Sequence, residues 1–392
     1  MSSQLAAPEI DGIEPSTIVE PESDGEVAAM LADARISGRG VIPVGGGSMI
    51  DVGDIPERYD LALSTRKLRG IVEYSPGDLT VVVRGGTTLQ ELQEELANHG
   101  QFVPLQPPSP DRATVGGVLA AALSGPWRQA YGSARDFTIG MRMALPSGQM
   151  AKSGGKVVKN VAGYDLAKLF IGSYGSLGVI TEVAFKVYPL PRECFDLVMD
   201  CRNETDAMSL ARRMAALGPG ILGVAALGKS VPNGEVLSWQ VVVMVGGTEG
   251  TVRDLASTVR SSAGTRAVSE SEDVSTLQRL AEEPGRATFH ISTLPSRTGS
   301  GLAELPIEEM LSYPSIGAAY ITAADVGSVQ IRRARDGLAP GGQLRLLHAS
   351  TELKREAGTW GPTGPDFPLM KRVKDVFDPE RVMSPGRFVG GL

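Results

Sequence analysis

The chain has 392 residues, of which 42% are hydrophobic and only 5% aromatic, and its net charge is −7. This length fits two or three domains of roughly 100–200 residues each, and an acidic chain without basic tracts is not typical of a nucleic-acid-binding protein. Two cysteines and three scattered histidines are too few for a disulfide framework, an iron–sulfur cluster or a zinc site.

The N-terminal half alternates short strands with helices. Residues 1–18 are expected to be a leader and do not resemble a signal peptide. No apolar run approaches the ~18 residues of a membrane span. We therefore expect a cytoplasmic protein. A helix is expected from Ser23 to Ser37, and a second one follows Thr87 and Thr88, where Leu89, Leu92 and Leu96 share a face. The expected strands are 41–44, 61–64, 70–74 and 79–84.

From Cys194 onward the pattern changes to longer strands and helices. Strands are expected at 195–201, 221–227 and 238–245, with helices at 204–217 and 250–262. A second group has strands near 287–293, 316–323 and 345–350 and helices near 301–312 and 326–337. This order predicts an α+β domain with an antiparallel sheet covered by helices. A Gly/Pro-rich linker, 358–368, a short helix through Phe377 and a tail follow.

Glycine is the residue type that most needs an explanation. Of 48 glycines, 21 lie between Gly45 and Gly178, and glycine-rich turns let backbone N–H groups converge on an anion. The Gly45–Ile50 segment lacks the last glycine of a dinucleotide-binding G-x-G-x-x-G motif. In Gly155-Lys156-Val157 a valine replaces the Ser/Thr of a P-loop, and Gly172–Gly178 has the wrong spacing. The sequence therefore predicts neither a nicotinamide Rossmann domain nor an NTPase.

In chain order the glycine segments form another pattern. A strand ends in Pro43-Val-Gly-Gly-Gly-Ser48, and Pro107-Pro-Ser-Pro-Asp-Arg-Ala-Thr114-Val-Gly-Gly117 follows. The third segment runs from Asn160 through Gly163 and Lys168 to Gly172-Ser-Tyr-Gly-Ser-Leu-Gly178 and Glu182. This set resembles the FAD-binding domain of the vanillyl-alcohol-oxidase (PCMH-type) flavoproteins, in particular the smaller FAD-binding subunits of bacterial glycolate oxidases. The tail resembles the family's D-P-x-x-x-x-N-P-G pattern, with Ser384 in place of asparagine.

The resemblance implies an α+β fold: a two-subdomain FAD-binding domain (19–192), an antiparallel-sheet cap domain (193–351) and a C-terminal tail (352–392) that returns to the FAD domain. The resemblance also implies which segments contact FAD. The first two glycine segments would cradle the pyrophosphate. Ser124-Gly125 and Tyr131-Gly132 would lie along the isoalloxazine ring, and Gly178–Ile180 would meet the adenine side. The implied cofactor-binding residues are Val44, Gly45, Gly46, Gly47, Ser48, Met49, Pro108, Thr114, Gly116, Gly117, Ser124, Gly125, Tyr131, Gly132, Gly175, Gly178, Val179 and Ile180.

Three departures from the family pattern bear on function. The first glycine segment has no histidine and the second no cysteine, so we expect non-covalent FAD. Tyr174 stands where many relatives have glutamate, and residues 193–351 lack the relatives' histidine-rich signature. His290 and His348 lie in apolar strands and are expected to be structural, as is His99 near a helix end. No residue is assigned as catalytic base and no metal is expected. The lysines 152, 156, 159 and 168 fit either a charge near the cofactor or partner, or a solvated loop.

The resemblance implies oxidation of a CH–OH group by a glycolate-oxidase-like complex. This chain would be an FAD-binding subunit in D-2-hydroxyacid oxidation, with a larger flavin subunit and an iron–sulfur subunit as partners and a cytoplasmic location, peripheral to the membrane through those partners. Two alternatives stay open at this point. The chain could be a self-sufficient FAD-linked oxidase or dehydrogenase of a small hydroxyl substrate, or a non-catalytic structural subunit.

Overall fold

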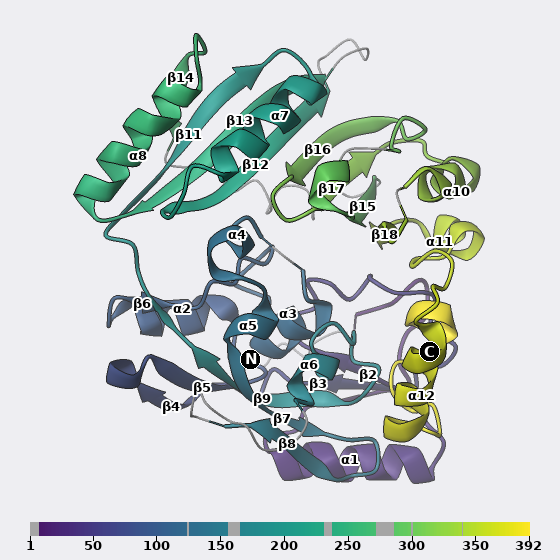
Figure 1. The fold of residues 1–392 in the computed structure, drawn as a ribbon. Helices are drawn as coiled ribbons and strands as arrows, with labels where there is room; N and C mark the ends of the chain where they lie inside the picture. The colour runs from purple at the N-terminus through teal and green to yellow at the C-terminus, as the bar shows by residue number, and fades with distance from the viewer. Residues whose placement is uncertain are drawn as a thin grey trace, which may run out of the picture. The chain divides into compact units, whose positions relative to one another are not determined.

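The computed structural model describes residues 8–123, 125–155, 165–230, 237–271, 286–298, 301–338 and 340–392. They form two compact units (Figure 1). Unit 1 contains the described residues up to 123 together with 134–189 and 362–392, and unit 2 contains 124–133 and 190–361. The domain limits expected from the sequence remain a prediction. The two units differ from these limits mainly because residues 124–133 and 352–361 belong to unit 2.

Unit 1 is built on three sheets. The strands β1 (Thr17–Val19), β3 (Leu61–Ser64) and β2 (Val41–Val44) form a parallel sheet in that order. An antiparallel sheet has the order β4 (Ile71–Ser75), β5 (Thr80–Arg84), β9 (Val179–Lys186), β7 (Thr138–Ala144) and β8 (Met150–Gly154). The short strands β6 (Gln101–Phe102) and β10 (Tyr188–Pro189) pair with each other. The four expected strands of the first half are confirmed to within about one residue at each end.

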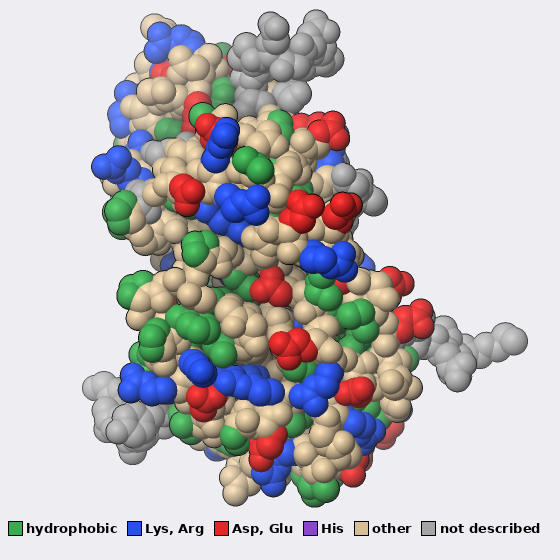
Figure 2. All heavy atoms as spheres, turned by 90° about the vertical axis from the view of Figure 1, so that its right-hand side faces the viewer, with side chains coloured by type: hydrophobic (Ala, Val, Ile, Leu, Met, Phe, Trp, Pro, Cys, Tyr) green, Lys and Arg blue, Asp and Glu red, His purple; other side chains and the backbone are tan. Residues whose placement is uncertain are grey.

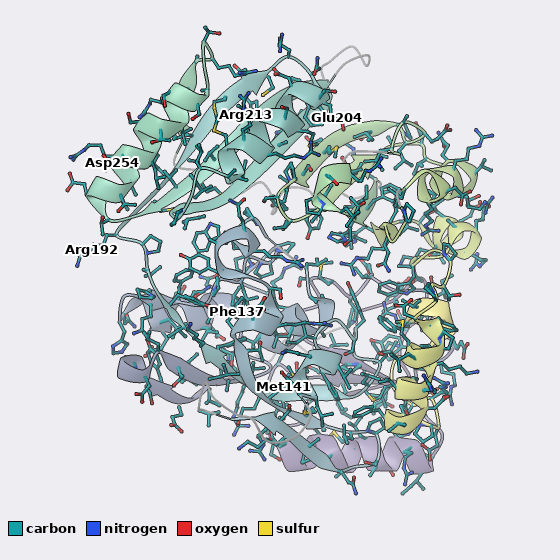
Figure 3. The ribbon with its side chains drawn as sticks, viewed as in Figure 1. Phe137, Met141, Arg192, Glu204, Arg213 and Asp254 are labelled. Atoms are coloured by element: carbon teal, nitrogen blue, oxygen red, sulfur yellow. The ribbon has the colours of Figure 1, made fainter. Side chains whose placement is uncertain are left out.

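The helices of unit 1 bury apolar faces against these sheets. They are α1 (Asp24–Ile36), α2 (Leu89–Ala97), α3 (Val115–Ala121), α5 (Ala134–Phe137), α6 (Ala167–Phe170) and α12 (Phe367–Phe377). Leu31 of α1 packs with residues of β2 and β3, while Leu92 of α2 and Leu119 of α3 pack with the valines of β5. Phe137 and Met141, labelled in Figure 3, belong to this second core and are 1% and 2% exposed.

The N-terminal segment is not a loose leader where the structure describes it. Ile10 is fully buried, in a small core with Ile42, Val44 and Tyr59, and β1 extends the parallel sheet. An apolar side chain that removes its surface from water stabilises the contact by about 1.5–3 kcal/mol, which ties this segment to unit 1.

Unit 2 is an eight-stranded antiparallel sheet covered by helices, as expected (Figure 1). Its strands are β14 (Val268–Ser271), β11 (Glu193–Cys201), β13 (Leu237–Gly247), β12 (Ile221–Ser230), β16 (Ile307–Tyr313), β17 (Ala318–Ala323), β15 (Ala287–Ser292) and β18 (Gln343–His348), in this order across the sheet. Its helices are α4 (Arg128–Tyr131), α7 (Glu204–Ala215), α8 (Glu249–Ser262), α10 (Ser328–Gly337) and α11 (Thr351–Ala357). In α7, Glu204 lies in the first turn and Arg213 in the last (Figure 3), where each charge complements the helix dipole.

One expected helix is wrong. Residues 307–313, part of the helix expected near 301–312, form strand β16. The spacing of Leu302, Leu305 and Met310 resembles a helical face, but Pro306 interrupts it and β16 pairs on both sides, with β12 and β17. Pairing in the centre of a sheet thus overrides the local pattern.

Residues 124–133 leave unit 1 in mid-chain and pack in unit 2. A Cβ on Gly223 of β12 would lie 2.7 Å from the carbonyl oxygen of Pro126. Gln129 donates to the Ala215 carbonyl at 3.3 Å and accepts from the Ser315 hydroxyl at 2.7 Å. These contacts between distant segments are invisible to local sequence patterns.

No helix among the described residues is long and apolar enough to cross a membrane. On the face shown in Figure 2, basic and acidic side chains are interspersed rather than gathered by sign. The net negative charge therefore does not form a single acidic patch on that face.

Helix α2 begins with a capping box that we expect to be important for its stability. Thr88 Oγ1 accepts from the Glu91 N–H at 3.2 Å, and the Glu91 carboxylate accepts from the Thr88 N–H at 3.1 Å. Thr88→Ala should cost about 1 kcal/mol, so amides of α2 should exchange with solvent about fivefold faster. Thr248→Ala, which removes the equivalent cap of α8 in unit 2, is the control. Unchanged exchange in α2 would show that the cap contributes nothing.

Candidate functional site

A cavity lies in unit 1, where the three glycine segments meet. Three segments and one tail residue form its walls. The lining residues are Ile42, Pro43, Gly45–Ile50, Val52 and Thr65, then Pro107, Pro108, Thr114, Gly116–Val118, Ala120, Ala121 and Leu123, then Ser173–Gly175, Gly178–Ile180 and Arg387.

Most of the cofactor-binding residues expected from the sequence line this cavity. They are Gly45, Gly46, Gly47, Ser48, Met49, Pro108, Thr114, Gly116, Gly117, Gly175, Gly178, Val179 and Ile180. Val44 is the last residue of β2, directly before the wall. Ser124 lies outside the described residues, and Gly125, Tyr131 and Gly132 belong to unit 2. For all of them, contact with the cofactor stays a prediction.

The Gly45–Met49 turn presents a row of open backbone donors. Among the described residues, the structure gives no acceptor for the N–H groups from Gly45 to Met49, whereas the next one, of Ile50, donates to the Gly47 carbonyl at 3.4 Å. Arg66 donates to the carbonyls of Gly45 and Gly46, both at 3.3 Å. In a trans peptide the N–H points opposite to the C=O, so the N–H groups of Gly46 and Gly47 face away from Arg66. Successive N–H groups of this kind form a concave site for an anion.

Glycine is required in this turn because another backbone segment passes very close to it. A Cβ on Gly45 would lie 2.2 Å from Thr114 Oγ1, and one on Gly46 would lie 1.6 Å from the Arg112 carbonyl oxygen. The first and second walls therefore touch backbone to backbone. Gly47 has a φ of +76° and open space at its Cβ position, which leaves room on that side for a ligand.

The second wall contributes shape rather than donors. The N–H of Gly116 donates to the Gly85 carbonyl at 2.8 Å, and the N–H of Gly117 donates to Thr114 Oγ1 at 3.3 Å. These two amides, expected from the sequence to be a second phosphate cradle, are bonded within the chain. Thr114 is the N-cap of α3, so its hydroxyl holds the wall in place.

The third wall is a tight turn at Ser173–Gly178. The Ser176 hydroxyl donates to the Ser173 carbonyl at 2.7 Å. Gly175 has a φ of +72°, and a Cβ at this position would lie 3.3 Å from the Pro43 ring of the first wall. Tyr174, the residue that replaces a family glutamate, lines the cavity, and its ring lies 6.1 Å from that of Phe388.

Arg387 is the only charged side chain among the described lining residues. Its guanidinium donates to the carbonyls of Ile50 and Val52, the latter at 2.9 Å, so it holds the chain that leaves the glycine turn. Burial lowers the pKa of Arg387, yet an arginine remains charged at neutral pH. Arg66 stands in no motif of the sequence, whereas Arg387 directly follows the Pro385-Gly386 pair of the tail pattern.

The histidines lie outside this cavity wall. His290 of β15 is buried, its Nδ1 accepts from Arg345 Nε at 3.2 Å, and its ring meets that of Tyr320 at 4.8 Å. Burial, and next the charge of Arg345, holds its pKa well below the ordinary value, so it is a neutral imidazole fixed in the sheet. His99 follows the end of α2 and packs edge-on against Tyr74, and His348 ends β18.

No group of His, Cys, Asp or Glu side chains in the described part of the chain is arranged to hold a metal ion. Of the four lysines considered above, Lys168 pairs with Asp165 at 3.1 Å and Lys152 lies exposed in β8. Lys156 and Lys159 fall outside the described residues. The lysine cluster thus stays a prediction.

Comparison with known families identifies the domain around the cavity. Residues 15–154 match the model of a family described as "FAD binding domain". This part of the chain is an FAD-binding domain, and FAD is its cofactor. The open amides and the close-packed glycines fit the FAD pyrophosphate, which carries about two negative charges and is well suited to backbone donors.

Several relatives among characterised proteins are named as oxidases or dehydrogenases of hydroxyacids. Glycolate oxidase subunit GlcE of Escherichia coli is 46% identical over 136 residues, which cover 34% of this chain and 39% of the relative. Glycolate oxidase subunit GlcD of Bacillus subtilis is 32% identical over 45% of this chain and 38% of its own length. A mitochondrial D-lactate dehydrogenase (cytochrome) of Arabidopsis thaliana is 32% identical over 50% of this chain and 34% of its own. The chain thus matches less than half the length of each of these relatives.

Solved structures support the fold over nearly the whole chain. A crystal structure of alkyldihydroxyacetonephosphate synthase superposes with a TM-score of 0.67 over 95% of this chain and 77% of its own, at 15% identity. At this identity the likeness establishes the fold alone. It confirms the expected class, an FAD-binding domain followed by an antiparallel-sheet α+β domain and a tail that returns to the first.

Gly46→Ala should disable the cavity, because the new Cβ would overlap the Arg112 carbonyl. Overpacking of this kind typically costs about 1–3 kcal/mol, which corresponds to roughly a 5- to 150-fold loss of FAD affinity if the loop moves to relieve it. Gly77→Ala is the matched control, since nothing lies within 4 Å of its Cβ position. FAD titration followed by flavin fluorescence measures both. Equal affinities in the two variants would contradict the close-packing argument.

Proposed function

We propose that this chain is an FAD-binding subunit of a glycolate-oxidase-like complex that oxidises small D-2-hydroxyacids. In this proposal the flavin passes its electrons to an iron–sulfur subunit, and a larger flavin subunit completes the complex. One relative is a glycolate oxidase subunit, and others are D-lactate dehydrogenases. These relatives support a substrate whose CH–OH group is bonded to a carboxylate. A cytoplasmic location, peripheral to the membrane through the partners, belongs to the same proposal.

The structural observation that carries the proposal is the cavity wall at Gly45–Met49, whose N–H groups have no acceptor among the described residues. When bound there, FAD supplies an oxidised ring that accepts two electrons from a CH–OH carbon. The chain's own residues hold the cofactor: the amides bind the pyrophosphate, Arg66 orients those amides, and Arg387 fixes the segment that follows them.

Oxidation of an alcohol also needs an acceptor for the hydroxyl proton. Among the described residues of the cavity wall there is no imidazole or carboxylate, and His290 is buried in a sheet with its Nδ1 bonded to Arg345. We therefore assign proton removal to a group outside this wall.

We further propose that FAD is held without a covalent bond, because the Gly45–Met49 wall contains neither histidine nor cysteine. Acid precipitation of the holoprotein should release the flavin into the supernatant, since unfolding removes every backbone contact. Absorbance at the flavin band in both fractions is the measurement. Yellow colour that stays in the washed pellet would contradict non-covalent attachment.

The shared reaction predicts how the flavin responds to substrate. In the isolated holo chain, glycolate and D-lactate should leave the flavin absorbance nearly unchanged, and addition of the larger flavin subunit and the iron–sulfur subunit should restore fast bleaching. L-lactate serves as the stereochemical control. Fast bleaching of the isolated chain would favour the self-sufficient dehydrogenase instead. A chain that never binds FAD would favour a structural subunit.

A further inference from the structure

We propose that Lys374 is a positioning residue for FAD, because its buried ammonium group ties the C-terminal tail to two walls of the cofactor cavity. The proposal rests on FAD binding by unit 1 and is independent of the substrate and partners proposed above. Lys374 lies on α12, drawn in yellow in Figure 1, and it does not line the cavity itself.

The ammonium group joins three segments. Lys374 Nζ donates to the Ser176 carbonyl at 2.7 Å, to Asp378 Oδ2 at 2.7 Å and to the Met383 carbonyl at 2.8 Å. A lysine ammonium has three protons, so each proton has an acceptor. The side chains of Lys374 and Asp378 are only 2% and 0% exposed, which makes this an ion pair shielded from water.

The Asp378 carboxylate also holds the tail, next to the Lys374 ammonium group. Its Oδ1 accepts from the Val382 N–H at 2.9 Å, and its Oδ2 accepts from the Met383 N–H at 2.8 Å. Hydrogen bonds to an ionised carboxylate are stronger than those between neutral groups. The carboxylate thus holds residues 382 and 383 in the position where Lys374 reaches the Met383 carbonyl.

The tail residues held in this way support the first cavity wall. The Val41 N–H donates to the Val382 carbonyl, and the Ser384 N–H donates to the Val41 carbonyl, both at 2.8 Å. The tail therefore forms a parallel β-bridge with the start of β2, and β2 continues directly into the Gly45–Met49 turn. Any shift of residues 382–384 would displace the strand that places the open amides.

The same tail residues support the third wall. The Ser384 hydroxyl donates to the Gly175 carbonyl at 3.3 Å, and Lys374 holds the Ser176 carbonyl one residue later. Gly175 in turn packs against Pro43 of the first wall. One buried charge thus sets the separation of the Gly45–Met49 turn and the Ser173–Gly178 turn, between which the cofactor has to fit.

Removal of the ammonium would leave the Asp378 carboxylate buried without its counter-charge and two carbonyls without a donor. Removing one partner of a buried ion pair destabilises a protein far more than the net contribution of that pair to stability suggests. Burial lowers the pKa of Lys374 and the Asp378 carboxylate opposes this shift, which is consistent with a charged pair. The disturbance would reach both walls through residues 176 and 382–384.

Lys374→Met tests the proposal in the full chain, with Lys371→Met as the matched control, because Lys371 is exposed on the same helix. In Lys374→Met we expect FAD affinity to fall about tenfold or more, by analogy with the loss of groups that support a metal ligand from behind. In Lys371→Met we expect it to stay within about twofold of the wild-type value. The visible circular dichroism of the bound flavin should also change only in the first. In Lys374→Ala, added propylammonium should restore part of the affinity. Unchanged affinity and dichroism in Lys374→Met would overturn the proposal.

A second measurement needs no variant and covers the case in which Lys374→Met does not fold. Because linkage is reciprocal, FAD binding to the wild-type chain should slow hydrogen exchange of the Val382, Met383 and Ser384 amides. Amides of β13 in unit 2 are the reference. Equal exchange of residues 382–384 with and without saturating FAD would overturn the proposal. Since neither experiment uses a hydroxyacid, a chain that binds FAD but oxidises nothing would refute the proposed function and leave this inference intact.

Discussion

The contact of backbone against backbone between Gly45–Gly46 and Arg112–Thr114 is the constraint on which unit 1 depends. A side chain at Gly46 would lie 1.6 Å from a carbonyl oxygen, so only glycine lets the two walls meet. Their contact brings the turn from β2, with its open N–H groups, opposite the N-cap of α3. This arrangement suits the binding of a dinucleotide by main-chain donors that we propose, a mode of binding that needs no cationic cluster around the pyrophosphate.

The supports of the cavity are charged side chains that bond backbone carbonyls. Arg66, which is half-buried, and Arg387, which is buried and lines the cavity, bond the carbonyls of the first wall. The buried Lys374 bonds those of the third wall and the tail. Such groups are costly to bury unless every donor is used, and at Lys374 all three protons have acceptors. This arrangement makes the last residues of the chain part of the cofactor site.

The helices and strands that the sequence predicted in unit 1 are confirmed. Which backbone N–H groups are bonded within the chain was not predicted correctly. The helix starting after Ser23 and the capped helix after Thr88 are confirmed because their end signals are local. The amides of Gly116 and Gly117 are bonded to Gly85 and Thr114, a pairing that depends on distant chain segments. Likewise, β16 is a strand because β12 and β17 flank it, although its spacing favours a helix.

By itself, the sequence determined the order of the glycine segments, the class of cofactor and the strand-rich nature of the second half, because these depend on residue type and short-range spacing. Only the tertiary structure decided which amides stay open, which arginines orient them and how the tail reaches both walls. The reason is physical: a hydrogen bond or a buried ion pair between residues some 200 positions apart, such as Lys374 and Ser176, leaves no periodic trace in the chain. It exists only once the segments have packed.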